Sequence, residues 1–307
     1  MKGNLASLLE RVGLSRATQI KRGSHWQLWE ATEQHTFGVE KVYALYFDSR
    51  ATETVVSEAA AEVRELLPKG SRYYAVVQAS ATIANDLAKL QAQSRAVGVY
   101  TLRQLLQRSV ERVLGATEPE RDLEAERLFV DPDVRSVSYD LTAPTDRQSS
   151  KALSSLSGWL KDDSEKGPRV AVLLAKAGVG KTTVARQLFR HLRFSTATAG
   201  RYPILVESDH WARLSDKTNL TLWDVWRESL DALYASSIGR DDIEMCVEQG
   251  LLLPIFDGFD ELCTRLGAHF SAVETLDQLL DLVKDTEGRI LITTRDTFWT
   301  DYLAEER

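Results

Sequence analysis

A glycine-rich segment at residues 175–183 carries the residue types that bind phosphate groups. It reads Ala-Lys-Ala-Gly-Val-Gly-Lys-Thr-Thr. Gly178 and Gly180 allow the backbone to curl so that its amides point inward toward an anion. The ammonium of Lys181 would reach the β- and γ-phosphates, and the hydroxyl of Thr182 would bind Mg²⁺. The segment therefore predicts a phosphate-binding loop (P-loop) for a nucleoside triphosphate with Mg²⁺.

The surroundings of this loop favour a P-loop over a chance glycine-rich turn. The apolar run 170–174 predicts a buried strand, and the segment from 181 predicts a helix whose N-terminus faces the anion. The general pattern begins with glycine, where this chain has Ala175, but the rest of the loop is intact. ATP or ADP is the expected nucleotide, although no residue pattern here distinguishes adenine from guanine. The residues expected to bind it are Ala175, Lys176, Ala177, Gly178, Val179, Gly180, Lys181, Thr182 and Thr183.

Three carboxylates follow a second apolar run, which begins about seventy residues after the P-loop. Residues 251–256 read Leu-Leu-Leu-Pro-Ile-Phe and predict a buried strand that ends at Asp257. Ligands of open α/β sheets bind at the carboxyl ends of the strands, so Asp257 is expected to hold Mg²⁺ through its water shell. Asp260 or Glu261 would then polarise the attacking water. The alternative is an exposed acidic turn around Gly258, which the preceding P-loop disfavours.

A third apolar run ends in a cation. Residues 289–294 read Arg-Ile-Leu-Ile-Thr-Thr and predict another buried strand, and Arg295 follows it directly. At the carboxyl edge of the sheet, Arg295 would sense the γ-phosphate and stabilise the charge that develops there. The alternative is a surface arginine that pairs with Asp296 or Asp301.

The order of predicted elements divides the chain into two α/β domains and a connector. Residues 1–114 form the smaller domain, residues 115–166 the connector with a short helix around Leu156, and residues 167–307 the second domain. In the first domain, helices are predicted through Leu5–Val12 and at 54–67, 83–92 and 102–114, and strands at 26–30, 42–47, 73–78 and 97–100. In the second, strands are predicted near 169–174, 202–207, 251–256 and 289–294, and helices near 181–193, 221–235, 241–249 and 270–284.

The composition limits the classes to which the chain can belong. A net charge of −7 argues against a general nucleic-acid coat and leaves room only for a local basic patch. No apolar run approaches the roughly 20 residues that span a bilayer, and no secretory signal core follows Met1. Cys246 and Cys263 lack metal-ligand spacing and are expected to be reduced thiols. We therefore expect a soluble, cytoplasmic protein with no membrane partner.

Several further side chains have ordinary structural explanations. Trp223 and Trp226 lie three apart on a predicted helix and are expected to pack in the core. Arg186, on the helix after the P-loop, is expected to be solvated or paired with an acid, as is Arg190. His25 has no partner at ligand spacing, so a structural role is favoured over metal binding.

Together, the three chemical elements resemble those of the NACHT family of STAND NTPases. Residues 175–182 are similar to its Walker A motif, residues 257–261 (Asp-Gly-Phe-Asp-Glu) to its Walker B motif, and residues 293–295 (Thr-Thr-Arg) to its sensor 1. The segment 202–206 (Tyr-Pro-Ile-Leu-Val) is similar to its second strand. The resemblance covers about residues 166–307.

The resemblance implies a parallel sheet in the order 5-1-4-3-2, and slow ATP hydrolysis with Mg²⁺ that works as a switch. It also implies homo-oligomerisation controlled by nucleotide. Members of this kind serve antiviral defence in bacteria and innate immunity in animals. In the family, a fifth strand, a helical lid, a winged helix and a sensing region follow sensor 1. Because the chain ends at Arg307, we expect a fold truncated after strand 4, with the P-loop strand at an unpaired edge. A missing C-terminal region would then sense the trigger, of pathogen or cellular origin.

The run from Tyr43 to Leu106 resembles restriction-endonuclease-like domains of the Mrr type. Nuclease activity in such domains needs an Asp and a Glu-x-Lys at the ends of a strand pair. No Glu-x-Lys occurs in this run, and the adjacent Glu40 and Lys41 would face opposite sides of a strand. We therefore expect a degenerate, non-catalytic domain that signals or recruits an effector. Two alternatives stay open for the whole chain: a DNA endonuclease gated by the NTPase, and a nucleotide-binding scaffold without turnover.

Overall fold

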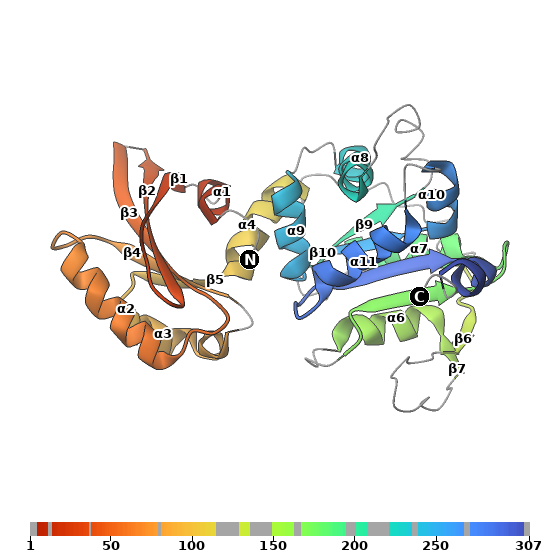
Figure 1. Cartoon of the computed structure of the whole chain (residues 1–307), viewed down its shortest axis with the longest axis horizontal. Coiled ribbons are helices and arrows are strands. Elements are labelled where there is room, and N and C mark those ends of the chain that lie inside the picture. Colours follow the sequence, from red (N-terminus) through yellow and green to blue (C-terminus); the bar gives the residue numbers. More distant parts are fainter. Residues whose placement is uncertain are drawn as a thin grey trace. The chain divides into compact units, whose positions relative to one another are not determined.

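The structure is a computed structural model, and its described residues fall into two compact units. It describes residues 5–11, 14–36, 38–78, 81–114, 129–135, 149–162, 167–194, 201–207, 221–234, 239–266 and 271–303. One unit comprises Met1–Ala116 with Asp241–Leu251, and the other comprises Thr117–Arg240 with Leu252–Arg307 (Figure 1). The domain boundaries given above stay a prediction. No helix of the described residues is both long and apolar enough to cross a membrane.

The first unit is built on a mixed sheet in the order β1-β2-β3-β4-β5. The first three strands pair antiparallel, and the last two are parallel to β3. The strands are β1 (Leu14–Arg22), β2 (Trp26–His35), β3 (Gly38–Phe47), β4 (Tyr73–Val77) and β5 (Gly98–Thr101). The helices are α1 (Leu5–Arg11), α2 (Glu53–Leu66), η1 (Thr82–Asn85), α3 (Leu87–Ser94) and α4 (Leu102–Leu114), and α9 (Arg240–Glu248) joins this unit from farther along the chain.

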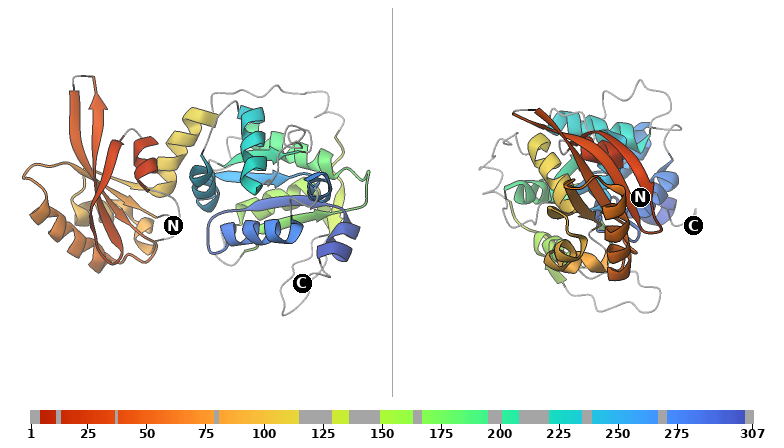
Figure 2. Two further views of the ribbon diagram at one scale, coloured as in Figure 1. Left: turned by 45° about the horizontal axis from the view of Figure 1, so that its top comes forward. Right: turned by 90° about the vertical axis from the view of Figure 1, so that its left-hand side faces the viewer.

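Helices α2 and α3 lie side by side on this sheet (Figure 2). Their buried residues Val56, Val63 and Leu90 pack against Leu45 and Ala75 of the central strands. Because β3 has a neighbour on each side and six consecutive buried residues, Val42 to Phe47, it forms the centre of the unit.

In the first unit, one strand was not predicted and one predicted helix differs in the structure. Strand β1 was not predicted, because only Leu14 of its nine residues is buried and the strand carries no apolar alternation. The helix predicted at 83–92 is interrupted at Asp86. The carboxylate of Asp86 accepts a hydrogen bond from the amide of Lys89 at 2.9 Å, so Asp86 starts a new helix instead of continuing the old one.

The second unit is built on a parallel sheet in the order β8-β11-β10-β9. The strands are β8 (Val170–Leu174), β9 (Tyr202–Val206), β10 (Leu252–Phe256) and β11 (Ile290–Thr294), which confirms the four predicted positions to within one residue at each end. This is the 1-4-3-2 part of the expected order; the fifth strand stays a prediction. Among the described strands, β8 pairs with β11 alone, and its five residues are half-buried.

The second unit has further described elements outside this sheet. They are β6 (Asp133–Arg135), β7 (Ser149–Lys151), α6 (Ala152–Lys161), α7 (Lys181–Phe194), α8 (Leu222–Tyr234), α10 (Phe259–Leu266), α11 (Ala272–Val283) and the π-helix η4 (Phe298–Leu303). Helices α6 and α7 pack on one face, where Leu156 and Leu188 contact Ile255 and Leu291. Successive strand residues face opposite sides, so Phe256 lies on the other face. There Phe256 packs against Trp226, with 5.8 Å between the ring centroids.

Helix α10 was not predicted, because no helix was expected between the strand that ends at Asp257 and the helix near 270–284. Gly258 has φ 73°, and the helix begins at the next residue. Asp260 and Glu261 therefore lie in its first turn, where the helix dipole favours negative charge. The core role predicted for Trp226 is confirmed, since its side chain is fully buried, and the half-buried Trp223 packs edge-on against it.

Candidate nucleotide-binding site

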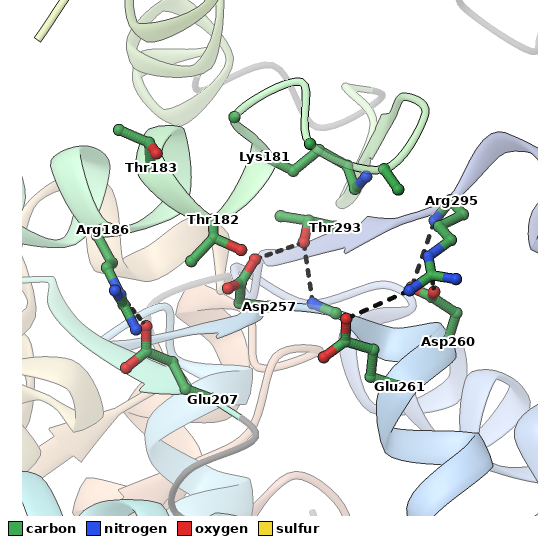
Figure 3. A pocket seen from close by; sticks show the side chains of 14 residues that line it. Lys181, Thr182, Thr183, Arg186, Glu207, Asp257, Asp260, Glu261, Thr293 and Arg295 are labelled. Carbon is green, nitrogen blue, oxygen red and sulfur yellow. Dashed lines mark hydrogen bonds and ion pairs between the residues drawn. The ribbon is translucent and has the colours of Figure 1, made fainter.

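A polar pocket of about 360 Å³ opens at the carboxyl ends of the parallel strands (Figure 3). The P-loop and α7 form one side, and the residues that follow β9, β10 and β11 form the other. The lining residues are Ala177, Gly178, Gly180, Lys181, Thr182, Thr183, Arg186, Glu207, Asp257, Gly258, Asp260, Glu261, Thr293 and Arg295. The tertiary structure therefore brings the predicted P-loop, the acidic strand end and Arg295 into one cavity.

The backbone of the P-loop has the conformation that the glycine pattern predicts. Gly178 has φ 76° and Gly180 has φ 98°, a region that L side chains rarely adopt. Ala175 is not among the described residues with positive φ, so alanine fits at the position where the general pattern has glycine. Val179 is exposed at the tip of the loop and does not line the pocket.

Lys181 is the first residue of α7, and its side chain folds back over the loop that precedes it. Its Nζ donates hydrogen bonds to the carbonyl oxygens of Ala175 at 2.8 Å and Lys176 at 3.0 Å. The ammonium is thus fixed beside the helix N-terminus, where backbone amides also point toward the pocket. Both groups present positive charge to the same space, as an anion-binding loop requires.

Asp257 is buried and held in one orientation by the neighbouring strand. The hydroxyl of Thr293 donates to Oδ1 of Asp257 at 2.7 Å and accepts a hydrogen bond from the amide of Gly258 at 3.0 Å. Figure 3 shows Thr182 above Asp257, on the facing helix. A threonine hydroxyl opposite a fixed carboxylate is a donor set of the hard oxygen ligands that Mg²⁺ prefers. Thr293 was assigned to a motif by the sequence analysis, but its contact with Asp257 was missed.

Asp260 and Glu261 are adjacent but differ in environment. Asp260 is buried, and its Oδ1 accepts hydrogen bonds from the hydroxyl of Thr294 at 3.2 Å and the amide of Arg295 at 3.3 Å. Its Oδ2 pairs with Nε of Arg295 at 3.0 Å. Glu261, by contrast, is about half exposed and makes one longer contact, 3.5 Å to Nη2 of Arg295. Of the two carboxylates that the sequence left open, Glu261 is therefore the one accessible to water.

Arg295 lines the pocket and pairs with these acids. Its guanidinium contacts Asp260 and Glu261. Of the two alternative partners that the sequence suggested, Asp296 and Asp301, the side chain of Asp301 lies outside the described residues. The short turn from β11 into the following residues directs Arg295 back toward α10. It thus connects the ends of two parallel strands, β10 and β11, across the pocket.

One acid–cation pair in the pocket was not predicted as part of the site. Nε of Arg186 on α7 donates to Oε1 of Glu207, which directly follows β9. The expected pairing of Arg186 with an acid is confirmed, but the partner was unknown. Glu207 had the same signal as Asp257, an acid directly after a buried strand, and the strand-end rule would have found it.

Cys263 lies near the pocket on α10 but does not take part in its chemistry. Burial, and secondly the charge of Asp260, raises the pKa of the Cys263 thiol to about 12. The thiol is therefore protonated at neutral pH and is a poor nucleophile. The sequence predicted a reduced thiol, and in the structure Cys263 is a free, half-buried cysteine.

The pocket fits a magnesium nucleotide on the evidence of its own donor set. A fixed ammonium, amides at a helix N-terminus and two positive-φ glycines face a hydroxyl and a buried carboxylate. Phosphate oxygens match the first group, and a divalent cation matches the second. The parts lie at the strand ends where α/β sheets bind ligands.

The sheet and the site define a P-loop NTPase fold. Its first strand leads into the glycine-rich loop and helix, and an acid ends the strand two positions away in the sheet. Comparison with protein families agrees with this fold, because the family model of the NACHT domain matches residues 169–306 of the chain. No curated protein and no solved structure matches the chain. The comparisons give no support to the suggested resemblance of residues 1–114 to Mrr-type nucleases.

Proposed function

We propose that this pocket binds ATP with Mg²⁺ and hydrolyses it slowly, and that the chain is part of a STAND-type nucleotide switch. One observation carries the proposal: a single pocket contains Lys181 and Thr182 of the P-loop together with Asp257 and Glu261. A phosphate cradle alone would suit any phosphorylated ligand. A cradle that faces a fixed carboxylate and an accessible second carboxylate has the parts that phosphoryl transfer to water needs.

Each residue has a separate role in this proposal. Lys181 and the amides of α7 bind the phosphates. Thr182 and Asp257 would hold Mg²⁺, which would supply positive charge next to the phosphates. Glu261 polarises the attacking water, because its carboxylate is accessible. Arg295 stabilises charge that develops on the γ-phosphate. Asp260 is a positioning residue that holds Arg295 at the mouth of the pocket.

Two variants test the proposal on separate steps. Lys181→Ala removes the phosphate cation and is expected to weaken binding of a fluorescent ATP analogue by at least about tenfold. Glu261→Gln is expected to leave that binding intact and to lower phosphate release by at least about a hundredfold. Lys284→Ala and Glu274→Gln are matched controls, since Lys284 is an exposed lysine and Glu274 an exposed acid in the first turn of α11.

The outcomes of this experiment separate the proposal from its alternatives. A wild-type chain that binds the analogue but releases no phosphate supports the scaffold without turnover. If the Lys181→Ala variant binds the ATP analogue as tightly as the Lys284→Ala control, the assignment of this pocket as the nucleotide site is overturned. Normal turnover in Glu261→Gln would remove Glu261 from the reaction and leave nucleotide binding untouched.

The switch itself is the broader part of the proposal. The match of residues 169–306 to the NACHT domain supports nucleotide-controlled homo-oligomerisation, and the family resemblance suggests a role in antiviral defence in the cytoplasm. The trigger would be a pathogen-derived or cellular molecule. Mass photometry of the chain with ADP and with a non-hydrolysable ATP analogue tests the first point. The same mass distribution in both states contradicts control of assembly by nucleotide in this chain.

For residues 1–114 we propose a non-catalytic role in signalling or recruitment. Glu40 and Lys41 are each paired elsewhere, Glu40 with Arg72 at 3.0 Å and Lys41 with Glu30 at 2.7 Å. These contacts support the view that the two residues do not form a metal-binding nuclease site. Incubation of the chain with supercoiled plasmid, Mg²⁺ and ATP is expected to leave the plasmid intact. Nicking that Glu40→Gln abolishes would favour the gated endonuclease instead.

A further inference from the structure

A second carboxylate flanks Asp257 in the pocket and has no role in the proposal above. Glu207 follows Val206, the last residue of β9, and Asp257 follows Phe256, the last residue of β10. Val206 and Phe256 are register partners, and the amide of Asp257 donates to the carbonyl of Val206 at 3.0 Å. Neighbouring strands lie about 5 Å apart. The two acids therefore leave adjacent strands at the same level, and both line the pocket.

The helix opposite carries a matching pair of side chains. Thr182 and Arg186 lie four residues apart on α7, so they share one face of the helix and are separated by one turn. Figure 3 shows that face turned toward the strand ends, with Thr182 near Asp257 and Arg186 bound to Glu207. The metal side of the pocket is thus built as two facing pairs, Thr182 with Asp257 and Arg186 with Glu207.

Because Glu207 is largely buried, its charge interacts strongly with other groups in the pocket. Its side chain is 14% exposed, while that of Arg186 is 46% exposed and reaches into solvent. A carboxylate that is largely shielded from water interacts more strongly with its neighbours than one on an open surface. Arg186 offsets the repulsion between two carboxylates on adjacent strands, and a divalent cation in the pocket would do the same.

We propose that Glu207 is a positioning residue for the magnesium nucleotide. It contributes the second negative charge on the metal side of the pocket, and Arg186 sets how much of that charge the cation meets. This inference rests on the proposed function, since it concerns the same pocket. It assigns to Glu207, which lies just beyond the segment 202–206 of the resemblance, a role in the preference of the pocket for magnesium-bound over metal-free nucleotide.

Removing the charge of Glu207 and removing the charge of Arg186 are expected to change the affinity for the magnesium nucleotide in opposite directions. Glu207→Gln removes the carboxylate and leaves the cation of Arg186 facing the metal, so it should weaken binding of the magnesium nucleotide. Arg186→Gln leaves Glu207 with its full charge, so it should strengthen that binding. A pair that serves only to hold β9 against α7 would behave differently, because the loss of either partner would disturb the pocket in the same direction.

The experiment measures binding instead of turnover. A fluorescent, non-hydrolysable ATP analogue is titrated with the 307-residue chain in Mg²⁺ and in EDTA. The Kd in EDTA divided by the Kd in Mg²⁺ is the gain in affinity that the metal gives. Glu207→Gln is expected to reduce this gain roughly fivefold, and Arg186→Gln to increase it about twofold. Glu207→Asp keeps the charge and should stay nearer to wild type than Glu207→Gln. Asp133→Asn, which breaks the exposed pair with Lys151 outside the pocket, is the control.

The possible results distinguish failure of this inference from failure of the proposed function. If both Glu207→Gln and Arg186→Gln reduce the gain, or if Glu207→Gln leaves it unchanged, the inference is overturned and nucleotide binding stands. If the wild-type chain binds the analogue in neither buffer, the proposed function fails and the inference with it. Circular dichroism and thermal unfolding of each variant identify a change that comes from misfolding, and Glu207→Asp then decides the matter.

Discussion

Nε of Arg295 lies 3.0 Å from Oδ2 of Asp260, and the amide of Arg295 donates to the other oxygen of the same carboxylate at 3.3 Å. The two residues are 35 positions apart in the chain and belong to the first turn of α10 and the end of β11. This contact ties the first turn of α10 to the residue that follows β11 at the pocket. Because both oxygens of Asp260 already have partners, we propose that Glu261 and not Asp260 activates the water.

The first prediction separates the two acids that follow Gly258. Asp260→Asn is expected to lower phosphate release by roughly tenfold, because a neutral side chain holds the Arg295 guanidinium less firmly. The double variant Asp260→Asn with Arg295→Gln should be no slower than the slower single variant, since both changes break one interaction. Steady-state phosphate release measures all three chains. A loss in Asp260→Asn as complete as that in Glu261→Gln, with additive effects in the double variant, would make Asp260 the base instead.

The second prediction concerns the hydroxyl that orients Asp257. Thr293→Val removes a fully buried donor of similar shape and leaves Oδ1 of Asp257 and the amide of Gly258 without this partner. We expect a loss of about 1–3 kcal/mol in the free energy of unfolding and a weaker dependence of nucleotide binding on Mg²⁺. Thr293→Ser keeps the hydroxyl and is the control. Equal stability and equal magnesium dependence of the Val and Ser variants would contradict the prediction.

The third prediction concerns a buried arginine far from the pocket chemistry. Arg289 is 1% exposed, and its guanidinium donates to the carbonyls of Trp159, Asp162 and Pro168, which lie at the end of α6 and just before β8. Arg289→Met leaves these carbonyls without that partner and is expected to lower stability by about 2–4 kcal/mol. Thermal unfolding should show a lower Tm than in Lys284→Met, a charge removal at an exposed site. Equal Tm values for the two variants would show that Arg289 does not stabilise this junction.

The fourth prediction follows from the Cys263 thiol. Because burial raises its pKa to about 12, the folded chain should react slowly with iodoacetamide at Cys263 near pH 8, and the unfolded chain rapidly. The folded thiol keeps its proton while the unfolded thiol loses it above its ordinary pKa of 9.0, so this group lowers stability as pH rises from about 9 toward 12. Mass spectrometry of peptides after timed labelling measures the rates. Labelling of Cys263 at the same rate in folded and unfolded chain would contradict its burial.

A large part of the second unit could be predicted from local pattern. The apolar runs at 170–174 and 252–256 are continuous because the two faces of a parallel sheet are covered by helices, and such runs are detectable without any neighbour. The glycine spacing around Lys181 also specifies its own backbone conformation, because φ values of 76° and 98° at Gly178 and Gly180 suit glycine. Motif and strand–helix context thus predicted the loop from residues close together in the chain.

Where the pattern was weak, the prediction failed for a physical reason. Strand β1 is an edge strand with mostly exposed side chains, so it lacks the apolar alternation that reveals a strand. Backbone hydrogen bonds and a side-chain contact between Ser15 and Thr32 pair it with β2. Helix α10 was missed because it is short, with eight residues, and closely follows a buried strand. Its start depends on the left-handed conformation of Gly258, with φ 73°.

The sequence by itself determined that this chain carries a phosphate-binding loop, an acidic strand end and a strand that ends in arginine, since each is a local pattern of residue types. The family resemblance supplied the expected strand order, and the tertiary structure decided which side chains meet at the sheet edge. The strand order β8-β11-β10-β9 places residues far apart in the chain at one sheet edge, so that Arg295 binds Asp260 and leaves Glu261 accessible. The same order makes Glu207 the neighbour of Asp257. Such contacts depend on which strands pair, and strand pairing is a property of the whole fold that no local spacing encodes.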